Sequence, residues 1–254
     1  MPLDGRVALV TGAAGGIGGA VARELAAQGA DVCLADCAAV DALAAELRAT
    51  GRKVHAIRMD VTQGNAVRAG VESVVATLGR LDILVNVAGT VSFGAAQTIA
   101  EDEWDRVHAI NLRGTFLCCQ AAIVPMRSRR YGRIVNIGSI LGKNGGNARP
   151  WIDPSEQERA ANVAYGTSKA GVHALTFYLA KELARDGITV NAVAPGPVAS
   201  AMTADFPERL RALIPAGRMG DAAEVAKACA FLAQESSAFI TGEILDVNGG
   251  MWMD

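Results

Sequence analysis

Uninterrupted apolar runs alternate with helix-like segments along the whole chain. Residues 6–10 (RVALV) and 82–86 (DILVN) are typical of these runs, because their apolar residues are consecutive and do not occupy only every second position. Strands of that kind are buried on both faces, as parallel strands are when helices cover the sheet on either side. The alternation therefore predicts right-handed strand–helix–strand units in one doubly wound, parallel α/β sheet.

The same pattern sets the expected element boundaries. Strands are predicted at residues 6–10, 31–35, 53–59, 82–86, 132–137, 189–193 and 244–247. Helices are predicted at about 17–28, 40–50, 163–185 and 222–234, with a further helix that ends near residue 78 and helical stretches that cover about 101–130. No repeat or linker interrupts the alternation, so residues 1–254 are expected to form a single domain.

Composition narrows the class of partner. The formal net charge is -2, so no general attraction to nucleic acid or to an anionic membrane is expected. We recognise neither a signal peptide nor a membrane-spanning run, which predicts a cytoplasmic protein. The cysteines match no zinc spacing and are expected to be buried free thiols in a reducing compartment; they are Cys33, Cys37, Cys118, Cys119 and Cys229.

A glycine-rich loop, residues 11–19 (TGAAGGIGG), joins the first strand to the first helix. Glycines permit a tight turn and the close approach of a pyrophosphate, and the helix that follows offers unpaired amides and a positive dipole end. The spacing of Gly12, Gly16 and Gly18 differs from the common G-x-G-x-x-G, and a simple tight turn is the alternative. Its place between strand and helix favours dinucleotide binding in a Rossmann-type fold.

Carboxylates follow the next two strands. Asp36 lies 18 positions after Gly18, where an acid can accept hydrogen bonds from the ribose hydroxyls of NAD and repel the 2′-phosphate of NADP. A solvated loop carboxylate is the alternative for Asp36. The pair Asp60–Val61 follows the third strand, and its carboxylate can either face the adenine amino group or cap the next helix.

Small and polar residues follow the fourth and fifth strands. Asn86, Ala88 and Gly89 would let a cofactor pass over the sheet edge, although a helix-entry turn has the same composition. Ser139 follows the fifth strand and says little by itself.

Tyr165 and Lys169 are four positions apart in a predicted helix and therefore share one face. A tyrosine phenol is too weak an acid to lose its proton readily at neutral pH, and a nearby ammonium lowers its pKa. Such a phenol can give a proton to a forming alkoxide or take one from an alcohol.

Taken together, these motifs resemble the short-chain dehydrogenase/reductase family along nearly the full chain. The resemblance rests on the residues of its glycine motif, on Asn86, Ala88 and Gly89 with Val87 in place of a second asparagine, and on the Pro-Gly turn after the sixth strand. The tail at 240–250 (ITGEILDVNGG) is similar to that of the 3-oxoacyl-[acyl-carrier-protein] reductases. The resemblance implies a nicotinamide cofactor bound by Gly12, Gly16, Ile17, Gly18, Asp36, Asp60, Val61, Asn86, Ala88, Gly89, Tyr165, Lys169, Pro195, Gly196 and Val198.

The resemblance also implies a catalytic set. Ser139 would hydrogen-bond the substrate oxygen, and Tyr165 would transfer the proton. Lys169 would lower the pKa of the tyrosine and bind the nicotinamide ribose, and Asn111 would support a water chain that returns the proton to solvent. No metal is implied. The expected activity is hydride transfer between NAD(H) and a secondary alcohol or ketone.

The chain departs from the family pattern at three places. Ser139 and Tyr165 are 26 positions apart, about twice the usual family spacing. Neither Ala14 nor Gly15 is basic, which favours NAD over NADP, and Asp186 stands where carrier-protein reductases often have a basic residue. An NADPH-dependent 3-oxoacyl reductase is the alternative function, and a non-catalytic dinucleotide sensor is the alternative of another class.

Two further expectations concern the surroundings of the site. Residues 142–162 and 197–220 are predicted to shape the substrate pocket, because loops beside active sites often carry specificity. The helices at 106–130 and 165–185 match the main interface elements of the family, and the C-terminal segment with Phe239 and Trp252 would pack across another interface. A homotetramer is therefore expected.

Overall fold

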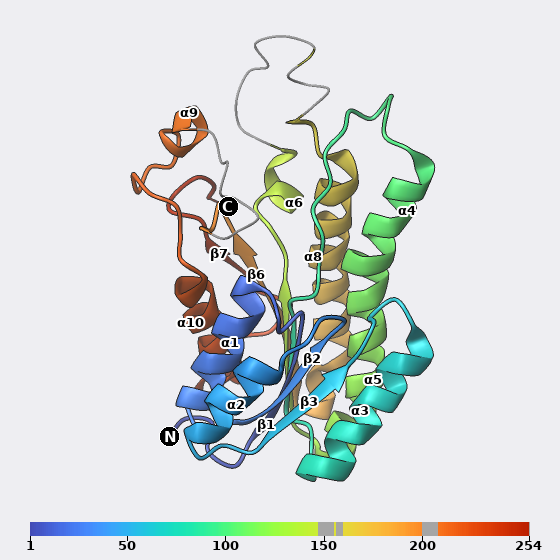
Figure 1. Cartoon of the computed structure of the whole chain (residues 1–254), viewed down its shortest axis with the longest axis vertical. Helices are drawn as coiled ribbons and strands as arrows, with labels where there is room; N and C mark the ends of the chain where they lie inside the picture. Colours follow the sequence, from blue (N-terminus) through green and yellow to red (C-terminus); the bar gives the residue numbers. More distant parts are fainter. Residues whose placement is uncertain (147–154, 156–159, 200–207, 254) are drawn as a thin grey trace.

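The computed structural model describes residues 1–146, 155, 160–199 and 208–253. Its centre is a seven-stranded sheet in the order β3-β2-β1-β4-β5-β6-β7, and every strand pair in it is parallel (Figure 1). The predicted doubly wound parallel sheet is thereby confirmed. Its strands are β1 (Val7–Thr11), β2 (Asp31–Asp36), β3 (Val54–Arg58), β4 (Ile83–Asn86), β5 (Gly132–Ile137), β6 (Ile188–Pro195) and β7 (Ile244–Val247).

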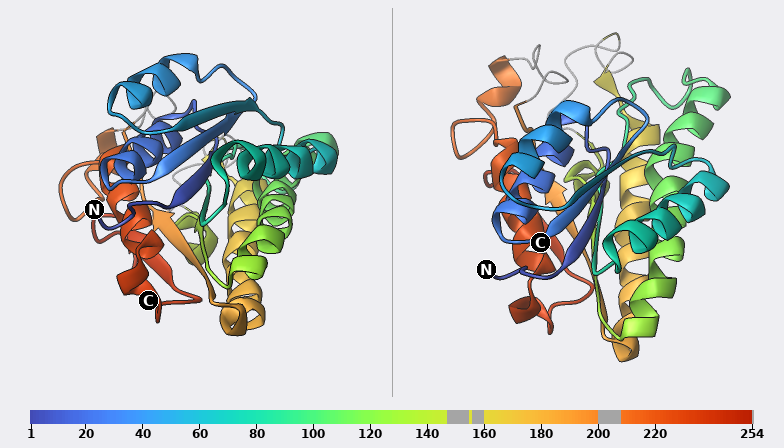
Figure 2. Two further views of the ribbon diagram at one scale, coloured as in Figure 1. Left: turned by 90° about the horizontal axis from the view of Figure 1, so that it is seen from below. Right: turned by 60° about the horizontal axis from the view of Figure 1, so that its bottom comes forward.

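Helices cover both faces of the sheet, as the views from the side and from below show (Figures 1 and 2). One layer contains α1 (Gly16–Ala27), α2 (Asp41–Ala49) and α10 (Ala222–Ala233). The other contains α3 (Gly64–Leu78), α5 (Gly114–Arg129) and α8 (Val163–Leu183). The helix α4 (Glu101–His108) leads into α5 and packs against α8.

Each face of the sheet has its own hydrophobic core, because neighbouring residues of a strand point to opposite sides. In β1, Ala8 and Val10 pack with the layer of α1 and α10, whereas Val7 and Leu9 pack with the layer of α3, α5 and α8. Both sets are fully or almost fully buried. This two-sided burial is the reason that residues 7–10 of β1 form an uninterrupted apolar run.

The helical stretches predicted over residues 101–130 are joined in the structure by a segment of different geometry. Between α4 and α5 the chain forms a single π-helical segment, η1 (Ala109–Arg113). Such segments inside α-helices occur frequently at functional sites. By length and composition alone the stretch Glu101–Arg129 could cross a membrane, a test that core helices of soluble proteins also pass. Here α5 lies against α3, β4 and β5.

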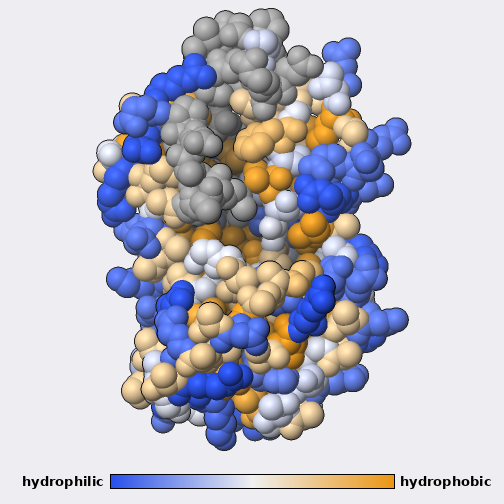
Figure 3. Space-filling model, in the orientation of Figure 1, coloured by the Kyte–Doolittle hydropathy of each residue, from blue (hydrophilic) through white to orange (hydrophobic). Residues whose placement is uncertain are grey.

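Shorter elements lie around the carboxyl edge of the sheet and in the connections. They are α6 (Leu141–Asn144), η2 (Ala184–Asp186), α9 (Glu208–Arg211) and η4 (Glu235–Ser237). Of the two segments predicted to shape the substrate pocket, residues 147–154, 156–159 and 200–207 lie outside the described residues. The space-filling view shows the molecule in the orientation of Figure 1. On the face turned to the viewer, apolar surface gathers in a depression across the middle of the molecule (Figure 3).

One expectation about the cysteines is wrong. Cys33, Cys118, Cys119 and Cys229 are buried free thiols, but Cys37 is exposed. Cys37 follows the last residue of β2, so it has left the sheet and the helices no longer cover it.

Candidate active site

The site begins where the strand order switches direction, between β1 and β4. Thr11 and Asn86 are the last paired residues of these strands, and the loops that follow them run to opposite sides of the sheet. The Thr11 hydroxyl oxygen accepts hydrogen bonds from the amides of Val87 (3.1 Å) and Ala88 (3.2 Å). This contact fixes the two loops to each other at the crevice in which doubly wound sheets bind ligands.

Two glycines of the loop after β1 are required by close backbone packing. Gly12 has a φ of +66°, and a Cβ there would lie 2.7 Å from the Ala88 amide nitrogen. A Cβ on Gly18 would lie 2.0 Å from the Gly12 carbonyl oxygen. Gly16 differs, because a Cβ there would meet nothing within 4 Å. Ile17 packs on the core beneath α1 and anchors the loop.

The N-terminus of α1 has the features of an anion site. Its N-cap is Gly15, which supplies no side-chain hydrogen bond, and its first turn contains no acidic residue. The first amides of a helix have no partner within the helix and carry its positive dipole end. Together with the open space at Gly16, this fits the pyrophosphate of a dinucleotide.

Asp36 lies at the end of β2 and faces this loop. One carboxylate oxygen accepts a hydrogen bond from the Ala14 amide at 3.0 Å, and the other accepts one from the Ala38 amide at 2.9 Å. The carboxylate is thus fixed beside the glycine loop, where an adenosine ribose would follow the pyrophosphate. Arg58 pairs with Asp36 across the strands, and it lines a cavity of about 320 Å³ together with Cys37.

Asp60 and Val61 follow β3. An Asp60 carboxylate oxygen accepts hydrogen bonds from the Thr62 amide (2.9 Å) and hydroxyl (2.8 Å). The helix α3 begins later, with Gln63 at its N-cap, so Asp60 shapes the turn before the helix and does not cap it. Val61 is buried against α5, where a Cβ on Gly114 would lie 2.8 Å from a Val61 methyl carbon.

Asn86 connects the carboxyl ends of two strands below the crevice. Its amide nitrogen donates to the Asn136 side-chain oxygen at 2.9 Å, and the Asn136 amide nitrogen donates to the Thr176 hydroxyl at 3.0 Å. All three side chains are buried. This chain of hydrogen bonds joins β4, β5 and α8, which carry the remaining site residues.

Tyr165, Lys169 and Ser139 meet at the carboxyl end of β5. Tyr165 and Lys169 lie on the same face of α8, with the lysine nitrogen 5.9 Å from the centre of the tyrosine ring. The Lys169 ammonium donates a hydrogen bond to the Ile137 carbonyl oxygen at 2.7 Å. The Ser139 hydroxyl lies close enough to the Tyr165 phenol to act on its pKa through hydrogen bonding.

Burial shifts the pKa of both titratable groups of this cluster. It raises the pKa of Tyr165, and the hydrogen bond from Ser139 opposes the shift. Burial also lowers the pKa of Lys169 to about 8, because the charged amine is removed from water. Titratable groups whose pKa values are displaced in a crevice are typical of catalytic sites.

Asn111 lies in η1 and completes the cluster. Its side-chain nitrogen donates hydrogen bonds to the Thr90 carbonyl oxygen and to the Ser168 hydroxyl, both at 2.9 Å. Its side-chain oxygen accepts a hydrogen bond from the Thr90 backbone amide at 2.8 Å. A Cβ on Gly89 would lie 3.3 Å from this oxygen and 3.6 Å from the Lys169 nitrogen. The loop after β4 therefore passes directly over Asn111 and Lys169.

The turn after β6 closes the far side of the crevice. Pro195 is the last residue of β6, and its carbonyl oxygen accepts a hydrogen bond from the Ile140 amide at 3.1 Å. A Cβ on Gly196 would lie 2.9 Å from the Asn248 Cα, so the turn packs tightly on the segment after β7. Val198 is buried and forms an isolated parallel bridge with Gly220.

Sequence reasoning missed three residues that contact this cluster. Thr90 and Ser168 fix the Asn111 amide, and His173 accepts a hydrogen bond from the Ser139 amide. His173 lies four positions after Lys169, so the periodicity of the helix already placed it on the same face. No sequence signal identified Thr90.

Comparisons with known proteins agree with this geometry. Residues 12–252 match the family described as enoyl-(acyl carrier protein) reductase. The chain is 39% identical over 256 residues to (2S)-[(R)-hydroxy(phenyl)methyl]succinyl-CoA dehydrogenase subunit BbsD of Thauera aromatica, covering 98% of each chain. It is 38% identical over 261 residues to the 3-oxoacyl-[acyl-carrier-protein] reductase FabG of Escherichia coli K12, covering all of both.

Solved structures give the same result. The crystal structure of gox2181 superposes with a TM-score of 0.89 at 36% identity, covering 98% of this chain and 96% of that one. A blue fluorescent protein from a metagenomic library, in complex with NADPH, superposes with a TM-score of 0.88 at 36% identity over the whole of both chains. The chain therefore belongs to the short-chain dehydrogenase/reductase family of oxidoreductases, as a member similar to the 3-oxoacyl-[acyl-carrier-protein] reductases.

Proposed function

We propose that the protein transfers hydride between NAD(H) and the carbon of a secondary alcohol or ketone, with Tyr165 as the acid and base. The observation that carries this proposal is the convergence of Tyr165, Ser139 and Lys169 at the carboxyl end of β5. A bound nicotinamide would supply or accept the hydride at its C4 atom. The protein supplies position, proton transfer and the exclusion of water.

Each catalytic residue has a separate task in this proposal. The Ser139 hydroxyl donates a hydrogen bond to the substrate oxygen and orients it toward the Tyr165 phenol. The phenol gives its proton to the forming alkoxide, or takes one from an alcohol in the reverse direction. Lys169 binds the ribose hydroxyls and stabilises the phenolate, and Asn111 supports the water chain that returns the proton to solvent.

The raised pKa of Tyr165 favours its role as an acid in the reductive direction. A phenol whose pKa lies above its ordinary value is protonated at neutral pH and is ready to act as an acid. Oxidation of an alcohol requires the phenolate, which an approaching positive nicotinamide ring and a charged Lys169 would stabilise. We therefore expect the oxidation rate to rise with pH and the reduction rate to fall.

Cofactor preference rests on Asp36. Its carboxylate is fixed beside the glycine loop by the amides of Ala14 and Ala38. A carboxylate in this position can accept hydrogen bonds from both ribose hydroxyls, whereas a 2′-phosphate would bring like charges within a few ångströms. We propose that the other cofactor contacts come from the glycine loop, the ends of β3 and β4, and the turn after β6.

An NADPH-dependent 3-oxoacyl-[acyl-carrier-protein] reductase is the second candidate. It is supported by the 38% identity to FabG and by the similar solved structure that contains NADPH. Within the chain, the observation that favours this candidate is the place of Arg58. It lies opposite Asp36 on the neighbouring strand and lines the adjoining cavity. A guanidinium there would offset part of the repulsion between Asp36 and a 2′-phosphate.

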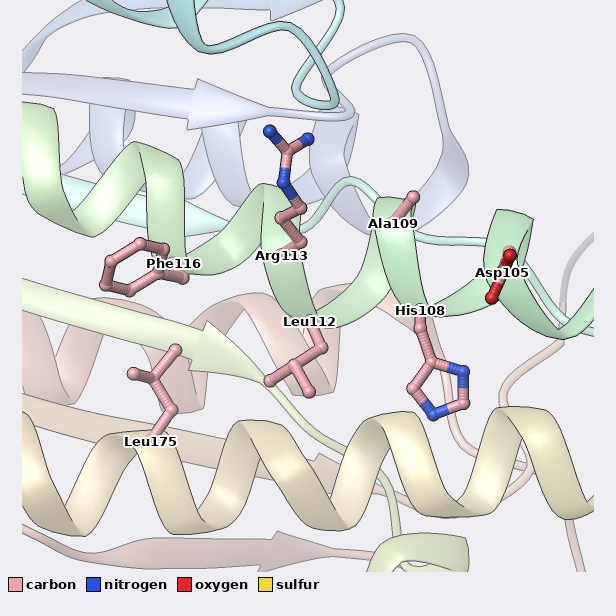
Figure 4. Close-up of a pocket in the computed structure, with 7 residues that line it drawn as sticks. All are labelled: Asp105, His108, Ala109, Leu112, Arg113, Phe116 and Leu175. Carbon is pink, nitrogen blue, oxygen red and sulfur yellow. The ribbon is translucent and has the colours of Figure 1, made fainter.

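We further propose a cytoplasmic homotetramer in which one domain carries both cofactor and substrate sites. An open groove of about 600 Å³ lies on the outer face of η1, α4, α5 and α8, as the close-up shows (Figure 4). Exposed apolar side chains of the same helices, among them Phe116 and Phe177, support burial of this face against a second copy. The groove is lined by Asp105, His108, Ala109, Leu112, Arg113, Phe116 and Leu175.

The test is a screen of ketones, 3-oxoacyl thioesters and secondary alcohols that follows nicotinamide absorbance with NADH and NADPH separately. Tyr165→Phe is the matched control, because it removes only the hydroxyl. We expect turnover by the wild type, and a loss on the order of a hundredfold or more in the variant with cofactor binding retained. Normal kcat in Tyr165→Phe would contradict the mechanism. A wild-type protein that binds the cofactor but turns over no substrate would favour the alternative of a non-catalytic dinucleotide sensor.

A further inference from the structure

Three polar side chains of α8 face the carboxyl half of β5. Lys169, His173 and Thr176 are spaced by four and three positions, which puts them on one face of the helix. All three are buried. A buried polar group costs free energy unless it is hydrogen-bonded, so the partners of these side chains indicate what they are for.

Each of these three side chains forms a hydrogen bond with a different residue of β5 or of the segment that directly follows it. The Thr176 hydroxyl accepts a hydrogen bond from the side-chain nitrogen of Asn136 at 3.0 Å. The Lys169 side chain donates a hydrogen bond to the Ile137 carbonyl oxygen at 2.7 Å. His173 accepts at Nε2 from the Ser139 backbone amide, with 3.4 Å between the two nitrogens. Of these three contacts, the one made by His173 reaches the catalytic serine itself.

The direction of the Ser139 amide follows from the sheet. The amides of Gly138 and Ile140 donate to β6, at the carbonyl oxygens of Val193 and Pro195, so the Ser139 amide between them points away from β6. On that other side β4 has already ended, because its last residue pairs with Asn136. The imidazole of His173 accepts the hydrogen bond that a neighbouring strand would otherwise accept.

Two glycines make room for the imidazole. A Cβ on Gly138 would lie 2.1 Å from His173 Nε2, and a Cβ on Gly142 would lie 3.0 Å from His173 Cε1. The ring therefore packs against the turn that carries Ser139, both before and after it. In the same turn the Leu141 amide donates to the Ser139 hydroxyl oxygen at 3.1 Å. A shift of the backbone at Ser139 would consequently move the hydroxyl.

We propose that His173 is a positioning residue that fixes the backbone of Ser139 so that its hydroxyl meets the substrate oxygen and Tyr165. The inference rests on the function proposed above. Because Nε2 accepts a hydrogen bond, the imidazole proton is on Nδ1. His173 acts through Ser139 and takes no part in proton transfer to the substrate.

The experiment compares two substitutions of similar size and shape. His173→Gln keeps an acceptor close to the position of Nε2, whereas His173→Met removes it. We expect kcat of the methionine variant to fall about tenfold, which corresponds to roughly 1.4 kcal/mol, with an unchanged KM for the nicotinamide cofactor. The glutamine variant should retain kcat within about threefold of the wild type.

A double-mutant cycle separates positioning from simple destabilisation. In a Ser139→Ala background the hydroxyl is already absent, so His173→Met should lower kcat no further. Equal kcat in the methionine, glutamine and wild-type proteins would overturn the proposal. Losses of kcat that add fully when Ser139→Ala and His173→Met are combined would also overturn it. If the methionine variant does not fold, His173→Asn replaces it, because its side chain is too short to bring an acceptor to Nε2.

Nitrogen NMR of the His173 ring tests the contact without turnover. An unprotonated Nε2 in the wild type is expected, and a proton on Nε2 would overturn the inference. A wild type that turns over no alcohol or ketone would instead contradict the proposed function. The two failures are therefore distinguishable.

Discussion

The ammonium nitrogen of Lys169 lies 2.7 Å from the carbonyl oxygen of Ile137. The lysine is thus bonded to the end of β5, two residues before Ser139, while its nitrogen is 5.9 Å from the centre of the Tyr165 ring. Burial lowers its pKa to about 8. The charged amine therefore costs the folded protein free energy, as is common where a position is selected for function.

This cost predicts a pH-dependent effect of Lys169→Met on stability. The pKa of the lysine is about 8 in the folded protein and 10.5 ordinarily, so between these values the unfolded chain binds more protons and wild-type stability rises with pH. Methionine does not titrate. The stability of the variant relative to the wild type should therefore fall by on the order of 3 kcal/mol as the pH rises across this window.

Urea unfolding of both proteins at about pH 7 and about pH 10 measures this difference. The hydrogen bond to Ile137 is stronger for the charged amine than for the neutral one, and this difference is already part of the shifted pKa, so it needs no separate correction. A difference between the two proteins that does not change with pH would show that Lys169 is not titrating in this window. The same substitution should weaken nicotinamide binding.

Asp36→Ala should reduce the preference for NAD(H) over NADP(H). A wild-type preference of roughly tenfold to a thousandfold corresponds to about 1.4–4 kcal/mol, the range expected for like charges in a partly desolvated cleft. The measurement is kcat/KM with each cofactor. Asp31→Ala is the control, because it removes the same charge from the opposite end of β2. Equal use of both cofactors by the wild type would be evidence against the role of Asp36.

Gly138→Ala should destabilise the protein and lower its activity. Its Cβ would lie 2.1 Å from His173 Nε2, so either the ring or the end of β5 must move. Overpacking of this kind costs about 1–3 kcal/mol. Adding His173→Ala should restore much of the stability without restoring kcat. Gly64→Ala, whose Cβ would meet only the flexible end of Arg68 and a Leu117 methyl group, should leave both unchanged.

Phe116→Glu combined with Phe177→Glu should break the proposed tetramer into smaller species. Both side chains are between two fifths and one half exposed in the single chain, and two buried carboxylates would oppose association of this face. Light scattering at micromolar concentration provides the mass. Ala45→Glu on α2, in the opposite helix layer, is the control. A wild type that is already monomeric would contradict the assembly itself.

The sequence by itself determined the parallel sheet and most element boundaries. Apolar runs such as 7–10 coincide with their strands because burial on both faces favours apolar side chains at consecutive positions. It also placed Asp36 and Ser139 at one edge, because the carboxyl ends of parallel strands all meet there, and it placed Tyr165 and Lys169 in the first turns of a helix that follows β5. It missed the π-helical segment at Asn111, since its apolar pattern continues that of the flanking helices.

Only the tertiary structure decided which side chains touch within that edge. Contacts such as Thr90 with Asn111, or His173 with Ser139, join residues that are 21 and 34 positions apart. The exposure of Cys37 likewise depends on whether another element covers the loop after β2, which the sequence alone does not show. Periodicity reports the face on which a residue lies, whereas the partner across the interface depends on how two elements pack, and that is a property of the whole fold.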